Sequence, residues 1–298
     1  MNMLELFNIG HFVLIGGTVI ILGGITIAIA ATPLRKNKKH TKILISVMLW
    51  FGFVIHFTRL PFPPHGDSWP SSIQYITPIS ISAFCAIVFP FIFHWGNRTW
   101  RDFMFYFGIL GGIIALVMPI AALDRPWYQF DAIRFFIQHG INGFAPLLMV
   151  ICGHHRINWR WAWVSFFVLL FVLGIILVNE ILLTAMGVVE QDMQQLLSAE
   201  RRNGAMIMGP EPRGGLGSDL FNFFCPPWFQ TALFDIPGAG VYRGDQFYWP
   251  IIWVVVPGIA LIVPICIMMG IMADHKRFGR DIKYVFRRRS RKLCRIKH

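Results

Sequence analysis

Seven long apolar segments are the feature that most constrains how this chain folds. They cover residues 9–31, 43–60, 73–95, 103–123, 132–153, 161–188 and 249–272. A helix of about 20 apolar residues crosses a bilayer, and in lipid its backbone polar groups must be paired within the structure. Only 14% of the residues are charged, which excludes a soluble globular enzyme, a disordered chain and a disulfide-stapled secreted module. We therefore expect an all-α membrane protein, a seven-transmembrane-helix bundle.

Basic residues gather in alternate connections between these segments, which predicts the orientation. They are Arg35, Lys36, Lys38, Lys39 and Lys42, then Arg98 and Arg101, then Arg156 and Arg160, and eleven Lys and Arg in the tail. Connections rich in Lys and Arg stay in the cytoplasm, so the N-terminus is expected outside and the C-terminus inside. The net charge of +12 then reflects topology, and no nucleic-acid partner is expected. The predicted location is the plasma membrane, with several passes.

The segments divide the chain into four parts. We expect residues 1–189 to form a six-helix part of the bundle, 190–248 an outer-face loop or cap, 249–272 the seventh helix and 273–298 a basic cytoplasmic tail. The aromatic and Pro-rich 190–248 segment is a candidate surface for protein partners. The tail has the pattern of a basic amphipathic helix that binds anionic inner-leaflet headgroups, with a plain positive-inside anchor as the alternative. Its expected headgroup-binding residues are Arg287, Arg288, Arg289, Arg291 and Lys292.

Polar side chains within the segments recur at one depth. Counted from the predicted outer ends, five of them lie roughly 10–14 Å below the surface: Ser80, Ser82, His139, Asn179 and Glu180. His11, His56 and Asn142 lie at neighbouring depths. Because polar groups within a bilayer are costly, this pattern predicts a polar cavity that opens to the outer leaflet and binds lipid. An interhelical polar network that only stabilises the bundle is the alternative.

The same residues suggest a chemistry for the cavity. His139 has an imidazole suited to general-base work near neutral pH, and Ser80 or Ser82 would then be the nucleophile. Asn179 or Glu180 could orient the ring. The five cysteines form no CxxC motif, so neither a metal site nor a disulfide framework is expected, and no cofactor is predicted.

Two stretches of the chain resemble a known family. Residues 106–119 contain Tyr-Phe-Gly-Ile-Leu-Gly-Gly followed by Pro119, and residues 135–140 read Phe-Phe-Ile-Gln-His-Gly. They resemble the YwaF-like family of bacterial seven-helix integral membrane proteins, which is distantly similar to a eukaryotic transmembrane phospholipid acyltransferase. The resemblance implies a seven-helix bundle with its N-terminus outside. It also implies acyl transfer by a Cys on the third helix and a His on the fifth.

His139 matches the histidine of that pair, and the third-helix motif departs from the family. The family motif is roughly Leu-Pro-Leu-His-Leu-Cys, where this chain reads Thr-Pro-Ile-Ser-Ile-Ser over residues 77–82. Both the His and the Cys are Ser here, which leaves open whether the chain is an enzyme. We expect a protein that binds or processes lipid in an outer-leaflet cavity, in the manner of a degenerate acyltransferase. The alternative is a structural or assembly subunit that binds partners through 190–248 and the tail.

Overall fold

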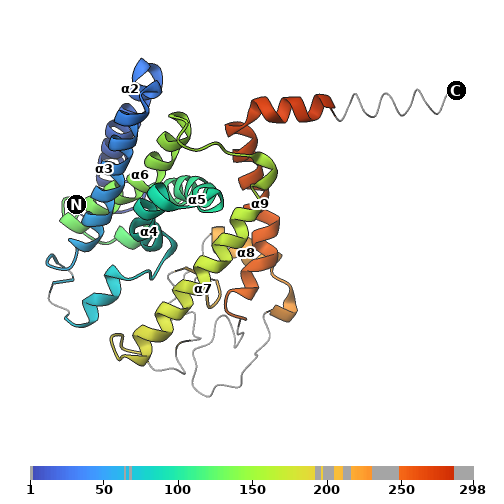
Figure 1. Ribbon diagram of the computed structural model, residues 1–298. Helices are drawn as coiled ribbons and strands as arrows, with labels where there is room; N and C mark the ends of the chain where they lie inside the picture. The colour runs from blue at the N-terminus through green and yellow to red at the C-terminus, as the bar shows by residue number, and fades with distance from the viewer. Residues whose placement is uncertain are drawn as a thin grey trace.

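The computed structural model is a bundle of α-helices, with no β-strand in the described part of the chain. It describes residues 3–63, 65–66, 69–191, 196, 205–210, 216–229 and 248–284. Its α-helices are α1 (Ile9–Thr18), α2 (Gly24–Ala31), α3 (Lys38–Phe57), α4 (Ile81–Trp95), α5 (Arg98–Val117), α6 (Phe130–Ile151), α7 (Val164–Ala185), α8 (Leu216–Phe224) and α9 (Val255–Ala273). A π-helical turn at Val19–Gly23 joins α1 to α2. Figure 1 shows their arrangement.

Five helical segments of the described chain are long and apolar enough to cross a membrane. They are Ile9–Ala31, Lys38–Phe57, Arg98–Val117, Val164–Ala185 and Ile252–Ala273. The other two expected segments differ from these for separate reasons. α4 has only 15 residues, and α6 has 22 residues but carries charged and amide side chains.

The third expected segment, 73–95, is not one continuous helix. Ser71–Ile76 forms a 3₁₀ helix, Thr77 is extended, and α4 begins only at Ile81. Pro78 explains the break, because the residue before a proline is pushed out of the α region. The expected depth of Ser80 and Ser82, which assumed a helix throughout, therefore does not apply to them.

Packing around α6 organises the N-terminal part of the bundle. α6 contacts α1, α3, α4 and α5, and 14 of its 22 residues are buried. α5 approaches it most closely, because a Cβ at Gly108 would lie 2.5 Å from the Asn142 carbonyl oxygen and one at Gly112 would lie 2.9 Å from that of His139. These two glycines therefore allow the close packing of α5 against α6 within the bundle.

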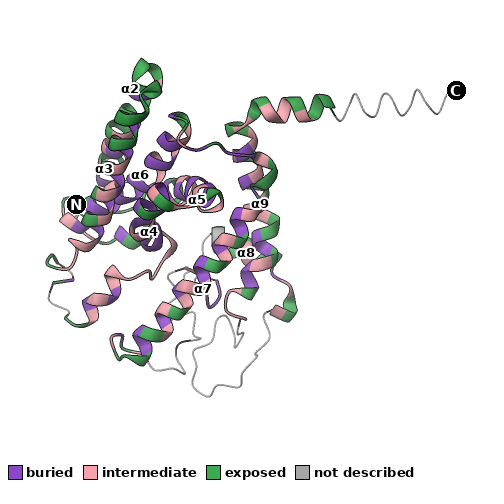
Figure 2. Ribbon diagram, in the orientation of Figure 1, coloured by how far each residue is buried: buried purple, intermediate pink, exposed green. Residues whose placement is uncertain are grey.

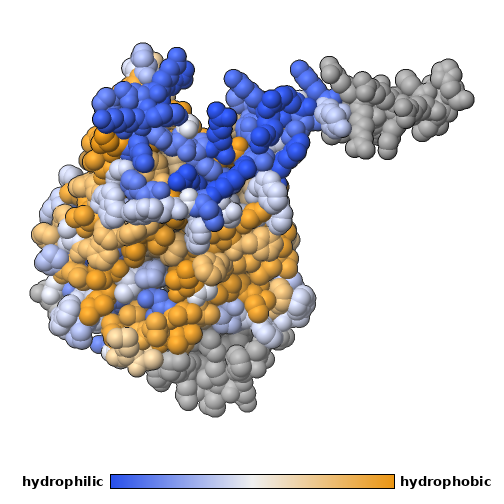
Figure 3. Space-filling model, in the orientation of Figure 1, coloured by the Kyte–Doolittle hydropathy of each residue, from blue (hydrophilic) through white to orange (hydrophobic). Residues whose placement is uncertain are grey.

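The surface has two chemically different zones. Large apolar side chains face outward along the helices, among them Ile20, Val47, Ile114, Phe171 and Met268. Figure 3 shows this apolar band, with hydrophilic residues gathered beyond one end. That end, called the basic end below, carries residues 32–42, 96–101, 153–163 and 274–284. The burial pattern in Figure 2 agrees, since exposed residues line the outer faces of the same helices.

Part of the 190–248 segment folds over the start of α9. α8 packs against α9, Trp253 donates from Nε1 to the Met206 carbonyl (2.8 Å), and the Tyr248 hydroxyl donates to Asn222 Oδ1 (2.7 Å). At the basic end, residues 275–284 are helical and turn away from α9 (Figure 1). The five expected headgroup-binding residues, Arg287, Arg288, Arg289, Arg291 and Lys292, lie outside the described residues.

Candidate functional site

A stripe of buried polar side chains runs along the first three turns of α6. It consists of Asp131, Arg134, Gln138, His139 and Asn142, each at most 8% exposed. Residues three or four apart share one face of a helix, so this face is polar from Asp131 to Asn142. The buried residues of the remaining turns, among them Ala145, Leu148 and Met149, are almost all apolar. The polar side chains are thus confined to the half of α6 away from the basic end.

The helix that contains His139 sets the orientation of its ring and which ring nitrogen donates. Its Nδ1 lies 2.7 Å from the Phe135 carbonyl oxygen, and the two rings lie 4.0 Å apart. A carbonyl oxygen only accepts hydrogen bonds, so Nδ1 carries the proton and donates. In the neutral ring Nε2 is then unprotonated, as required of a general base.

The start of α4 is held by two other helices. Asn142 of α6 donates from Nδ2 to the Ser82 carbonyl (3.3 Å), and Asn179 of α7 donates from Nδ2 to Thr77 Oγ1 (3.0 Å). Ser80 is the N-cap of α4, where its Oγ accepts from the Ala83 amide (3.2 Å). Asn142 and Asn179 thus each contact the 77–82 segment that contains Ser80 and Ser82, and His139 lies one turn from Asn142 on α6.

The remaining expected site residues have separate environments. His11 accepts at Nδ1 from the Phe7 amide (3.0 Å), just before α1, and donates from Nε2 to the Leu116 carbonyl (2.9 Å), so the Nε2 bond fastens α1 to the end of α5. His56 is buried on α3, and its Nε2 has no hydrogen-bond partner among the described residues. Glu180 is buried on α7.

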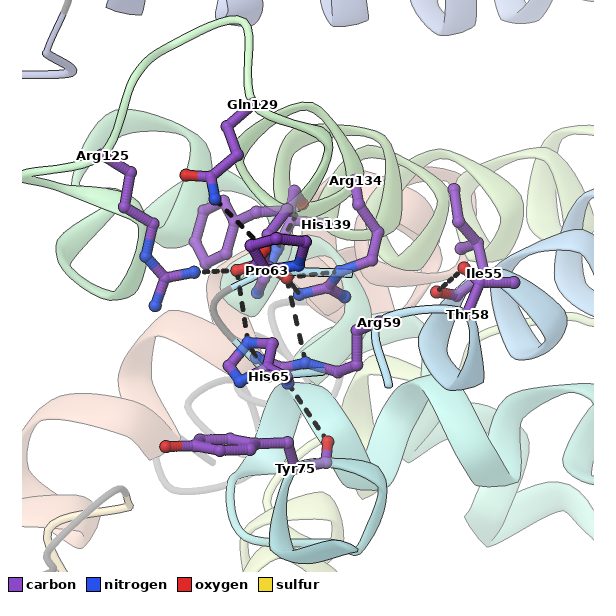
Figure 4. Close-up of polar contacts among 12 residues, drawn as sticks. Ile55, Thr58, Arg59, Pro63, His65, Tyr75, Arg125, Gln129, Arg134 and His139 are labelled. Atoms are coloured by element: carbon purple, nitrogen blue, oxygen red, sulfur yellow. Dashed lines mark hydrogen bonds and ion pairs between the residues drawn. The ribbon is translucent and has the colours of Figure 1, made fainter. Parts of the chain in front are cut away.

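A cluster of arginines around one carboxylate lies at the first turn of α6, and the sequence reasoning missed it. Arg134 donates from Nε to Asp131 Oδ1 (2.9 Å), Arg125 pairs with Asp131 Oδ2, and Arg59 Nε lies 3.9 Å from Asp131 Oδ1. Figure 4 shows the three arginines approaching from separate segments. Below, "the arginine cluster" means Arg59, His65, Arg125, Asp131 and Arg134.

His65 completes the cluster as a neutral ring. Arg59 Nη2 lies 3.0 Å from His65 Nε2, and a guanidinium only donates, so Nε2 accepts and is unprotonated. Burial and the positive charges of Arg59, Arg125 and Arg134 lower the pKa of His65 to about 3, which agrees with that geometry. Burial and the charge of Arg134 likewise lower the pKa of Arg125.

Neighbouring loops fix the position of the cluster. Arg59 also donates from Nη1 to the Tyr75 carbonyl (3.1 Å) and lies over the Tyr75 ring. The backbone of Arg125 is held by the N-terminal segment, since Leu4 N–H donates to the Arg125 carbonyl (2.6 Å). A signal for the cluster was present in the sequence, because Arg59 and Arg134 are charges within the expected segments 43–60 and 132–153.

The model of the TMEM164 family matches residues 6–211. The chain belongs to the TMEM164 family. The region shared with that family includes α1 to α7, the α6 stripe and the arginine cluster, whereas α8, α9 and the basic tail lie beyond it. No curated protein and no solved structure matches the chain.

For this TMEM164-family chain, the apolar helices indicate a multi-pass membrane protein. Within the described residues, no group of three or more His, Cys, Asp or Glu side chains could hold a metal ion. The side chains available for chemistry include the His139 imidazole, the hydroxyls and amides around the start of α4, and the arginine cluster.

Proposed function

We propose that this integral membrane protein binds a lipid beside His139 and the start of α4, in the leaflet away from the basic end. The observation that carries the proposal is the half-polar α6, whose buried Gln138, His139 and Asn142 lie between helices in a bundle with an apolar surface. Ionisable side chains within a bilayer are costly and are by default candidates for a functional site. The positive-inside charge pattern supports the assignment of this leaflet as the outer one.

The contacts favour Ser82 over Ser80 as the reacting hydroxyl. Ser80 Oγ already accepts from the Ala83 amide as a helix cap, whereas Ser82 contributes its backbone carbonyl to Asn142 and keeps its hydroxyl out of the cap. The resemblance to the YwaF-like proteins and their acyltransferase relatives supports an acyl-transfer reaction. Ser82 Oγ would give its proton to His139 Nε2 and attack an acyl ester. The departing alcohol would take that proton. A second alcohol would then attack the acyl group on Ser82 and give its proton to His139 Nε2, and that proton would return to Ser82 Oγ as its bond to the acyl group breaks.

Replacement of His139 tests this proposal. Protein purified in a mild detergent is extracted and its bound lipids are measured by mass spectrometry, for wild type and for His139→Ala. His94→Ala is the matched control, because His94 is a partly buried histidine of α4 that hydrogen-bonds Ser46 (3.1 Å). We expect His139→Ala alone to lose or change the bound lipid. An identical lipid profile in all three proteins would refute the proposal.

Catalysis is tested separately from binding. Wild type and Ser82→Ala are incubated with a phospholipid that carries a labelled acyl chain and with an unlabelled lysophospholipid as acceptor. Transfer of label by wild type and its loss in Ser82→Ala are the expected results. Transfer by Ser82→Ala at the wild-type rate would exclude Ser82 as the nucleophile.

A structural or assembly role is the second candidate function. Phe223 is 80% exposed on α8 and Trp228 is 64% exposed just after it, and exposed aromatic side chains are typical of contact surfaces. Substitution of both by Ser should release a partner and reduce the size of the particle extracted in mild detergent. An unchanged particle size would argue against this role.

A further inference from the structure

The arginine cluster carries more positive charge than its own acid neutralises. Three guanidiniums surround the single carboxylate of Asp131, and His65 is neutral because it accepts from Arg59. Among the described residues no other carboxylate pairs with these arginines, so two positive charges are left in excess. The side chains of Arg134 and Asp131 are 5% and 3% exposed, and charge buried this deeply is costly unless an opposite charge compensates it.

The contacts also leave donor capacity unused. Arg59 Nε is buried without a hydrogen-bond partner in the described chain, and its nearest acid oxygen is 3.9 Å away. Asp131 Oδ1 is already occupied by Arg134, and Oδ2 by Arg125. A guanidinium presents five donors in a planar fork that matches phosphate oxygens. The arrangement is therefore that of a basic site in which both oxygens of the single internal carboxylate already pair with arginines.

One edge of the cluster is open. The Arg125 side chain is 26% exposed and that of Arg59 is 13% exposed, against 5% for Arg134. Arg125 lies in the connection between α5 and α6, at the end of the bundle away from the basic end. An anion can therefore reach the arginines from the rim of the apolar band, where the phosphates of a bilayer lie.

From these contacts we infer that the arginine cluster binds the phosphate group of a phospholipid. The inference deepens the proposed function and rests on it, because it assigns the headgroup of the lipid beside His139. Arg134 and His139 lie five residues apart on the buried half of α6, or about 7.5 Å along the helix axis. A phosphate at the cluster would place the glycerol esters of the same lipid deeper, toward His139. The cluster would thus set the position of the lipid along α6.

Thermal stabilisation by short-chain lipids measures this binding, since a ligand that binds the folded state raises the unfolding temperature. The probes are dioctanoyl phosphatidate, dioctanoylglycerol with the same chains but no phosphate, and inorganic phosphate. We expect phosphatidate to stabilise the wild-type protein, dioctanoylglycerol to do so weakly, and inorganic phosphate only at much higher concentration. Equal stabilisation by phosphatidate and dioctanoylglycerol would overturn the inference. Equal stabilisation by inorganic phosphate would assign the site to free phosphate instead.

Arg125→Gln tests the residues, because Arg125 is the most exposed cluster arginine and lies outside the helices. We expect its apparent affinity for phosphatidate to fall ~10-fold or more, the scale of a lost charge-assisted hydrogen bond. Arg98→Gln is the matched control, since Arg98 also faces an aspartate, Asp102 at 3.8 Å, but at the basic end. Wild-type affinity in Arg125→Gln, or an equal loss in Arg98→Gln, would contradict the inference.

Two further outcomes separate this inference from its alternatives. Asp67 lies outside the described residues, and Asp67→Asn tests it as an internal counter-ion. If Asp67→Asn lowers the unfolding temperature of the lipid-free protein as much as Asp131→Asn does, Asp67 is the internal counter-ion and the inference is overturned. If lipid binding depends on His139 but not on phosphate or Arg125, the proposed function stands and the headgroup assignment fails.

Discussion

Asp131 should be the most sensitive position at the end of the bundle that holds the arginine cluster. It is 2% exposed and pairs with both Arg134 and Arg125. Removing one partner of a buried ion pair costs about 3–5 kcal/mol. Since Arg125 is partly exposed, we expect Asp131→Asn to cost about 3 kcal/mol, at the lower end of this range. At about 2 °C per kcal/mol for a chain of this size, the unfolding temperature should fall by roughly 6 °C.

The buried cysteines supply the assay for this prediction. Cys85, Cys152 and Cys266 are free and buried, so a thiol-reactive dye reports unfolding as they become accessible. Asp281→Asn is the control, because Asp281 pairs with Arg160 on an exposed surface, where ion pairs contribute little. The reasoning would be refuted if Asp131→Asn unfolded at the wild-type temperature. It would also be refuted if Asp281→Asn lowered the unfolding temperature by the same amount. Addition of Arg125→Gln to Asp131→Asn should restore part of the loss, because it lowers the uncompensated charge.

Two further predictions concern helix packing and pH. Gly108→Ala should lower stability by about 1–3 kcal/mol, because the new Cβ would lie 2.5 Å from the Asn142 carbonyl oxygen. Gly111→Ala, with nothing within 4 Å, should instead raise stability by roughly 0.5–1 kcal/mol; equal effects in the same dye assay would contradict the α5–α6 contact. The pKa of His65 falls from 6.5 to about 3 on folding, so the unfolded chain binds one more proton between these values. Stability should therefore decrease as pH falls through this window, by at most about 1.4 kcal/mol per unit. The unfolding temperature of His65→Gln should depend less on pH, and an unchanged dependence would show that His65 is not responsible.

Sequence alone identified the membrane class and most of the helices. Apolar length decides whether a segment can cross a bilayer, and that property is local to the segment. The expected ranges 9–31 and 249–272 therefore lie close to the observed Ile9–Ala31 and Ile252–Ala273. The prediction of one continuous helix over 73–95 was wrong, because Pro78 disfavours the α conformation of the residue before it and α4 begins only at Ile81. The apolar length of a segment carries no information about such a restriction at a single residue. The number of membrane crossings and their orientation remain predictions from length and charge.

Tertiary structure decided which polar residues belong together. From the sequence, Ser80, His11 and His139 were all predicted to line one polar cavity, with His139 as the base and Ser80 as a candidate nucleophile. In the fold, Ser80 caps a helix, His11 fastens α1 to α5, and His139 donates from Nδ1 to the Phe135 carbonyl of its own helix. The arginine cluster shows the same limit, because Arg59 and Asp131 are 72 positions apart in the sequence. Local sequence fixes which segments are helical and apolar, but the partners of a buried charge depend on how those helices pack, and packing is a property of the whole chain.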